Sequence, residues 1–198
     1  MAYAPVSQDT PWQNSDSLDL STTALLVIDV LGGDSGLPEG FEEEAGNCVR
    51  LADAARVAGV PVIFCNDAHI PAYDRELELW GEHGVAGTEG ATPLAEFGDR
   101  SGDVIIPKRR YDAFFQTDLD LTLRELGIDT VVAVGCDANI CVLHTLAGAY
   151  YRGYRSIVAA DAVWTFLVGT LNGALEHMSA CFDTRVSATA ELLEKFGA

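Results

Sequence analysis

The sequence predicts an α/β fold with three layers, α/β/α, built around a mostly parallel, doubly wound sheet of six strands. Short apolar runs alternate with segments of helical periodicity, as expected for βαβ units. Several runs are apolar throughout, which indicates strands covered on both faces. The chain has 198 residues and is 48% hydrophobic, enough for one core and too short for two. We therefore expect a polar arm over residues 1–20 and a single domain over residues 21–198.

Six short runs account for the predicted strands. In chain order they cover residues 24–28, 60–65, 104–106, 130–134, 156–160 and 185–187. Apolar residues at helical spacing predict helices over 42–58, 119–126, 140–152 and 170–182, followed by a short terminal helix. Gly59 and Gly127 end the first two helices, and Asn139 is the predicted N-cap of the third. The stretch 70–102 is irregular, and a connection of this length is usually functional or partly structured.

Composition narrows the class of protein. The net charge is −18, from 30 acidic and 12 basic residues, which argues against nucleic acid or an anionic membrane as a partner. No apolar run has bilayer-spanning length and the N-terminus lacks a basic start, so we expect a soluble, cytoplasmic protein. The five cysteines include no C-x-x-C pair, so neither a disulfide framework nor a structural zinc site is expected. Only Lys108 and Lys195 are lysines; the acidic, lysine-poor composition suggests adaptation to high salt, with an acidic mesophilic enzyme as the alternative.

Chemically active side chains follow four of the predicted strands, and parallel strands bring their carboxyl ends to one edge of a sheet. Asp29, Asp67 and Lys108 follow the first three strands, and Cys141 lies in the first turn of the helix after the fourth. A thiol at a helix N-terminus faces unpaired N–H groups, which favour its thiolate and can receive an oxyanion. Cysteine, aspartate and lysine together supply a nucleophile, a proton acceptor and a cation that balances their charge.

Cys141, Asp29 and Lys108 could each have a structural role in place of a catalytic one. Cys141 could be a small buried hydrophobe, Asp29 a carboxylate that caps the following loop, and Lys108 one member of a basic patch. Two other functional classes are a catalytically silent binding module and a redox protein that uses Cys136 with Cys141. The absence of C-x-x-C spacing weakens the redox reading, and a binding module has no need of these three residue types at strand ends.

The chain resembles the isochorismatase-like cysteine hydrolases, which have a Rossmann-type fold, and among them most closely the nicotinamidases and related small-amide hydrolases. The matching segments are residues 24–30, Lys108 with Tyr111 and Phe114, and residues 135–142 with Thr145. The resemblance implies a catalytic triad of Asp29, Lys108 and Cys141. It also implies a cis peptide bond between Cys136 and Asp137, and an oxyanion hole formed by the backbone N–H groups of Asp137 and Cys141.

The resemblance further implies a divalent metal held by Asp67, His69 and His83. One carboxylate and two imidazoles suit zinc, iron or manganese and leave coordination positions open. His144 and His177 lie outside this pattern, and we expect both to be structural.

The favoured reaction is hydrolysis of a small carboxamide through a thioester acyl-enzyme, with nicotinamide as the favoured substrate. Trp80, Tyr111 and Phe114 are the predicted substrate contacts.

The segment 30–34 lacks an aromatic residue that nicotinamidases usually carry there, and Asp137 places a carboxylate beside the oxyanion hole, where it must point away or alter specificity. A carbamoyl, ureido or aliphatic amide is therefore an alternative substrate, and an isochorismatase-type vinyl-ether hydrolase is an alternative enzyme. A homo-oligomer is expected.

Overall fold

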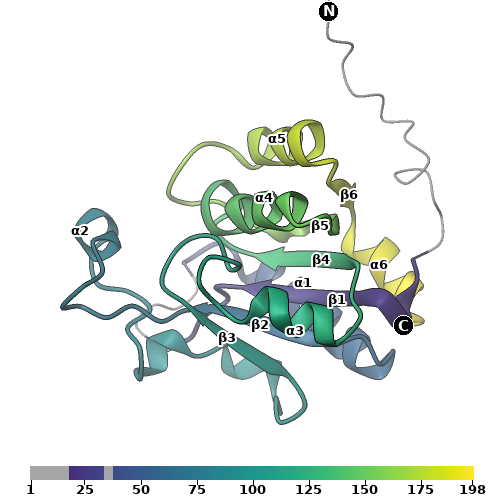
Figure 1. Ribbon diagram of the computed structural model, residues 1–198, viewed down its shortest axis with the longest axis horizontal. Coiled ribbons are helices and arrows are strands. Elements are labelled where there is room, and N and C mark those ends of the chain that lie inside the picture. The colour runs from purple at the N-terminus through teal and green to yellow at the C-terminus, as the bar shows by residue number, and fades with distance from the viewer. Residues whose placement is uncertain (1–17, 34–37) are drawn as a thin grey trace, which may run out of the picture.

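The computed structural model describes residues 18–33 and 38–198 and confirms the predicted α/β architecture (Figure 1). All strand pairs of the six-stranded sheet are parallel, in the order β3-β2-β1-β4-β5-β6. The strands are β1 (Thr23–Ile28), β2 (Val62–Asp67), β3 (Val104–Lys108), β4 (Thr130–Gly135), β5 (Arg155–Val163) and β6 (Arg185–Ser187). The order reverses between β1 and β4, and open α/β sheets bind ligands beyond the carboxyl ends of the strands at such a point.

Helices cover both faces of the sheet. They are α1 (Glu42–Val57), α2 (Glu76–Trp80), α3 (Leu119–Glu125), α4 (Leu143–Tyr151), α5 (Leu171–Phe182) and α6 (Thr189–Phe196). Helices α1 and α6 contribute to the core on one face, and α3, α4 and α5 contribute to the core on the other. Figure 1 shows α1 behind the sheet and α3 in front of it.

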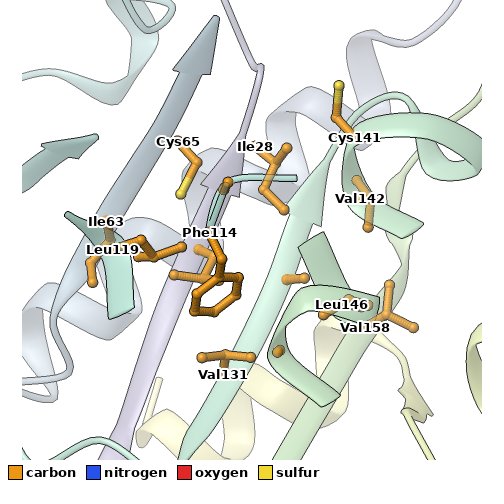
Figure 2. Packing of buried hydrophobic residues seen from close by; sticks show 14 of the residues in the cluster. Ile28, Ile63, Cys65, Phe114, Leu119, Val131, Cys141, Val142, Leu146 and Val158 are labelled. Atoms are coloured by element: carbon orange, nitrogen blue, oxygen red, sulfur yellow. The ribbon is translucent and has the colours of Figure 1, made fainter. Parts of the chain in front are cut away.

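The central strand β1 is buried on both faces, which explains its uninterrupted apolar sequence. Leu26 and Ile28 point to the layer of α3, α4 and α5, whereas Leu25 and Val27 point to the layer of α1 and α6. Figure 2 shows Ile28 packed in the first of these clusters. Burial of both faces fixes the register of β1, so the position of the residue that follows it is also fixed.

Two predicted segments need further description. The first 17 residues of the predicted arm lie outside the described residues, and a 3₁₀ turn at Leu20–Thr22 leads into β1. The irregular stretch 70–102 contains α2 and two 3₁₀ turns, Glu89–Ala91 and Ala95–Phe97. None of the helices in the described ranges combines the length and apolar character needed to cross a membrane.

Candidate active site

The ends of β1, β3 and β4 bring Asp29, Lys108 and Cys141 together. Asp29 directly follows β1, Lys108 is the last residue of β3, and Cys141 lies in the turn after β4. The Lys108 Nζ atom is 2.7 Å from Asp29 Oδ2 and 3.5 Å from Cys141 Sγ. Lys108 is fully buried, so its ammonium is enclosed by these partners. Three side chains far apart in the sequence therefore form one cluster at the sheet edge, as the strand-end pattern predicts.

Local backbone contacts orient Asp29. The residue has a φ of 50°, a conformation that Asp tolerates better than most side chains. Its Oδ1 atom accepts a hydrogen bond of 2.8 Å from the Asp67 N–H, and its carbonyl oxygen accepts one of 3.2 Å from Cys136 Sγ. Gly135 permits this close approach of β1 and β4, because a Cβ there would collide with the Ile28 carbonyl oxygen. The carboxylate is thus held toward Lys108 by its neighbours on β2 and β4.

Burial sets the protonation of Asp29 and Lys108. Burial and the Asp67 carboxylate raise the pKa of Asp29 to about 6, although the Lys108 ammonium opposes the shift. Burial alone would lower the pKa of Lys108, but the carboxylates of Asp29 and Asp67 outweigh it and raise that pKa well above its ordinary value. Asp29 can therefore exchange a proton near neutral pH, while Lys108 stays charged.

The pKa of Cys141 corrects a prediction. Its place at the start of a helix favours the thiolate, yet burial raises the pKa of the thiol well above its ordinary value, and the nearby Lys108 ammonium only opposes this. Cys141 is 7% exposed, so loss of hydration outweighs the helix terminus. The resting thiol is protonated, and its reaction as a nucleophile requires a base.

The turn that carries Cys141 is one turn of π-helix, Ala138–Val142, which leads into α4. The peptide bond between Cys136 and Asp137 is cis, as the resemblance implies. The cap is Asp137 and not Asn139, because Asp137 Oδ1 accepts a 2.8 Å hydrogen bond from the Asn139 N–H. The Asn139 side chain instead donates to Thr165 Oγ1 at 3.0 Å. Single π-turns of this kind occur frequently at functional sites.

The Asp137 carboxylate points into the loop that follows β5. Besides the Asn139 N–H, it accepts hydrogen bonds from Thr165 Oγ1 at 2.8 Å, the Phe166 N–H at 2.9 Å and the Leu167 N–H at 3.1 Å. Its own N–H donates to no acceptor in the part of the chain that the structure describes. The side chain thus turns away, as one of the two sequence-based alternatives requires, and leaves that N–H group for another acceptor.

A second cluster begins at the end of β2. Asp67, His69 and His83 lie together, and Glu76 of α2 joins them although it is not among the predicted ligands. One possible ligand atom from each residue lies within 4.8 Å of the others. Both ring nitrogens of the buried His69 lack a hydrogen-bond partner among the described residues, whereas His83 Nδ1 donates to Gly81 O at 2.8 Å. This donor set and the orphaned His69 nitrogens fit a divalent metal such as zinc, iron or manganese.

Asp67 connects the two clusters. Its Oδ1 atom lies 2.5 Å from Lys108 Nζ and 3.6 Å from His69 Nε2. Burial would raise the pKa of Asp67, but Lys108 and His69 together lower it to about 2. Gly84 allows this packing, because a Cβ there would lie 2.6 Å from the Asp67 Cβ. The metal cluster and the Lys108 cluster therefore share one carboxylate.

Members of both clusters line one cavity of about 230 Å³. Its wall includes the predicted contacts Trp80 and Tyr111, and the Trp80 Nε1–H donates to Tyr111 Oη at 3.0 Å. Phe114 lies elsewhere, because it is 3% exposed and packs in the core (Figure 2). Its ring stacks on that of Tyr154. In the same figure the Cys141 sulfur points away from the packed side chains.

The two remaining histidines lie outside the metal cluster. His144 Nδ1 contacts Ile140 O at 2.7 Å, and its ring lies 5.6 Å from the ring of Tyr111. His177 on α5 packs against Phe182.

Comparison with known proteins agrees with this geometry. The model of the isochorismatase domain matches residues 23–191. An isochorismatase family protein of Bacillus subtilis is 34% identical to this chain, and the match covers 77% of this chain and 83% of the relative. A ureidoacrylate amidohydrolase of Methylobacterium radiotolerans is 31% identical, and the match covers 74% of this chain and 68% of the relative. Among solved structures, N-carbamoylsarcosine amidase of Thermoplasma acidophilum has a TM-score of 0.77 and 35% identity, covering 85% of this chain and 96% of its own. Nicotinamidase of Bacillus subtilis has a TM-score of 0.74 and 29% identity, and the match covers 84% of this chain and 99% of the nicotinamidase. The chain belongs to the isochorismatase family.

Proposed function

We propose that the protein is a cysteine amidohydrolase that cleaves a small carboxamide through a thioester acyl-enzyme. The observation that carries this proposal is the position of Lys108 Nζ, 2.7 Å from the Asp29 carboxylate and 3.5 Å from Cys141 Sγ, beside a cavity that both residues line. A nucleophile, a base with a raised pKa and a permanent cation are the parts that acyl transfer through a thiol requires. Relatives and solved neighbours that act on amides support the same reaction class.

In the proposed mechanism Asp29 accepts the proton of Cys141 as Sγ attacks the carbonyl carbon of the amide. Lys108 balances the negative charge that passes from Asp29 to the sulfur and back. The N–H groups of Asp137 and Cys141 receive the oxyanion, and Asp29 then donates its proton to the departing ammonia. Water, activated by Asp29, hydrolyses the thioester and restores the thiol.

The same proposal assigns the metal to Asp67, His69, Glu76 and His83. A divalent ion bound there would supply a Lewis-acidic point that holds a substrate atom or a water molecule. Asp67 would orient that ion relative to Lys108, because its carboxylate contacts both clusters. Cys141 supplies the nucleophile.

Nicotinamide is one candidate substrate and is not favoured over ureido and carbamoyl amides, because relatives named for all three kinds match this chain. Ureidoacrylate and N-carbamoylsarcosine carry a carboxylate, whereas nicotinamide is uncharged. Trp80 and Tyr111, at the cavity wall, are the proposed stacking faces for an aromatic amide.

The proposal is tested by ammonia release from nicotinamide, N-carbamoyl, ureido and aliphatic amides, with zinc, manganese or iron added. Cys141→Ala should abolish release, because no acyl-enzyme can form. Cys136→Ala is the matched control and should keep most of the activity, because the hydrogen bond of its thiol goes to the backbone carbonyl oxygen of Asp29 and not to its carboxylate. Comparable ammonia release by Cys141→Ala would show that the nucleophile is misassigned. Cleavage of a vinyl ether without any amidase activity would favour the isochorismatase-type alternative.

A further inference from the structure

We infer that the cavity selects amides whose non-reacting part is apolar and carries no negative charge. This inference rests on the proposed function, because it names the substrate class of the same site. It follows from where the protein places its cations, carboxylates and free backbone N–H groups around the cavity.

No lysine or arginine lies in the cavity wall, and its one histidine, His83, is already beside Asp67 and Glu76. All 12 lysines and arginines belong to the described residues, since residues 1–17 and 34–37 contain none, and none of the 12 lines the cavity. Lys108 lies beneath it, fully buried and engaged by Asp29 and Asp67. Arg110 borders a separate hollow, where its guanidinium lies 3.1 Å from Asp74. A substrate carboxylate inside the cavity would therefore meet no unpaired cation of the protein.

Negative charge is in excess at the same place. Asp29, Asp67, Glu76 and Asp137 all line the cavity. Among the described residues Lys108 is the one lysine or arginine that contacts any of them, and the imidazoles of His69 and His83 lie near Asp67 and Glu76. Four carboxylates and one ammonium leave three negative charges. A protonated imidazole would offset one of them and a divalent ion in the metal cluster two, so negative charge remains in excess in either case. An anionic substrate would add like charge to this cavity, which disfavours its binding.

The loop after β5 would otherwise offer an anion site. Its successive N–H groups at Phe166 and Leu167, with the Thr165 hydroxyl, converge as backbone donors do in anion-binding nests. The carboxylate that fills this nest belongs to the protein, because Asp137 accepts from all three. The chain itself thus occupies the donors with which the wall could bind a substrate carboxylate.

The rest of the wall is apolar. Val30, Leu31, Ile140 and Trp164 line the cavity with the side chain of Leu167. An uncharged ring or alkyl group can displace water from these surfaces, and that supplies binding energy without a charged partner. The apolar side chains of the wall therefore favour an apolar substituent, while its carboxylates disfavour a negatively charged one.

The test compares benzamide with 3-carbamoylbenzoate, which share a ring and a carboxamide and differ by one carboxylate. With metal added, kcat/KM for benzamide should exceed that for 3-carbamoylbenzoate by about 30-fold, the effect of one like charge at about 8 Å with an effective dielectric constant of about 20. The aliphatic pair 4-oxopentanamide and succinamate should show the same order. Equal or faster turnover of the anionic partners would overturn the inference and leave the amidohydrolase proposal intact.

A binding measurement tests the selectivity of the cavity independently of the proposed amidohydrolase activity. Tryptophan fluorescence of Cys141→Ala should show tighter binding of benzamide than of 3-carbamoylbenzoate, since Trp80 and Trp164 line the cavity. If no amide is hydrolysed, the proposed function fails, and this ratio of dissociation constants still decides the inference. Failure to bind benzamide at all would also overturn it.

Leu167→Arg, compared with its uncharged control Leu167→Gln, tests the role of charge directly. Leu167 is 44% exposed, so the wall can accept a longer side chain there. The arginine should reduce the preference for benzamide by about 10-fold relative to glutamine, because it supplies the missing cation. An unchanged preference would show that charge does not discriminate between the two probes.

Discussion

Replacing Lys108 by Met removes the ammonium that contacts Asp29, Asp67 and Cys141 and keeps a side chain of similar length. In the wild type Lys108 Nζ contacts Asp29 and Asp67 at 2.7 and 2.5 Å, and all three side chains are buried. Breaking a buried charge network by removing one partner costs about 3–5 kcal/mol. A domain of this size loses about 2–4 °C per kcal/mol, so the melting temperature should fall by about 6–20 °C.

The same substitution should also lower the rate of attack by the thiol. A thiolate 3.5 Å from the ammonium gains about 5 kcal/mol with an effective dielectric constant of about 20. Loss of that interaction slows the attack by about three orders of magnitude, which kcat/KM for ammonia release measures. Lys195→Met on α6, the chain's other lysine, is the matched control and should stay within about 0.5 kcal/mol of wild type.

The stability loss in Lys108→Met should depend on pH. The pKa of Asp29 is raised to about 6 in the folded protein, against about 3.9 in an unfolded chain, so the folded state binds more protons between these values and stability falls as the pH rises through them. Without Lys108 the folded pKa rises further, so the loss should be larger at pH 8 than at pH 5. Lys108→Arg keeps the charge, but its guanidinium is too large for the enclosed site, and activity should again be severely impaired. Wild-type kcat/KM in Lys108→Met, or a stability loss independent of pH, would refute this account.

Three further results are expected. Glu76→Gln and His83→Ala should each bind less zinc, manganese or iron than wild type by metal analysis, because the first replaces an anionic carboxylate by a weaker neutral amide and the second removes an imidazole from a four-residue set. Asp137→Asn should raise KM more than it lowers kcat, because the carboxylate fixes the loop of Phe166 and Leu167 in the cavity wall. In wild type, kcat/KM should fall as the pH drops through about 6, because protonated Asp29 cannot accept the thiol proton.

Each of these has a contradicting outcome. Full metal content in both metal-site variants would leave the cluster as a hydrogen-bonded structural feature. An Asp137→Asn enzyme with unchanged KM would mean that the loop does not shape the site. A flat pH profile between 5 and 7 would show that another group takes the proton of Cys141.

The fold could be predicted because its signals are local. The apolar run before Asp29 and the change of period before Cys141 identify strands and a helix, and parallel strands place those residues at one edge. The spatial order of the strands could not be predicted in the same way. It depends on which strands pair side by side, and the sequence of each strand alone leaves its neighbours open.

The site shows where local patterns stop being informative. Glu76 shares an irregular stretch with Glu78, Glu82 and Glu89, and only the course of the chain turns it toward His69. Phe114 is near Tyr111 in sequence, yet the backbone directs it into the core.

Two predictions about the nucleophile turn were wrong for a related reason. Residue type predicts Asn139 as the cap, whereas Asp137, two residues earlier, accepts the hydrogen bond from the Asn139 N–H. The effect of the helix terminus on the pKa of Cys141 depends on its burial, which sequence does not show.

The central claim is that Cys141 carries the acyl group, and rapid quenching during turnover of the fastest amide in the panel tests it most directly. Mass spectrometry of the digested protein should find the acyl group on the peptide that contains Cys141. Added hydroxylamine should divert the intermediate to the hydroxamate. Cys136→Ala should give the same adduct and Cys141→Ala none. Ammonia release without any adduct or hydroxamate, or an acyl group on a different residue, would contradict the account.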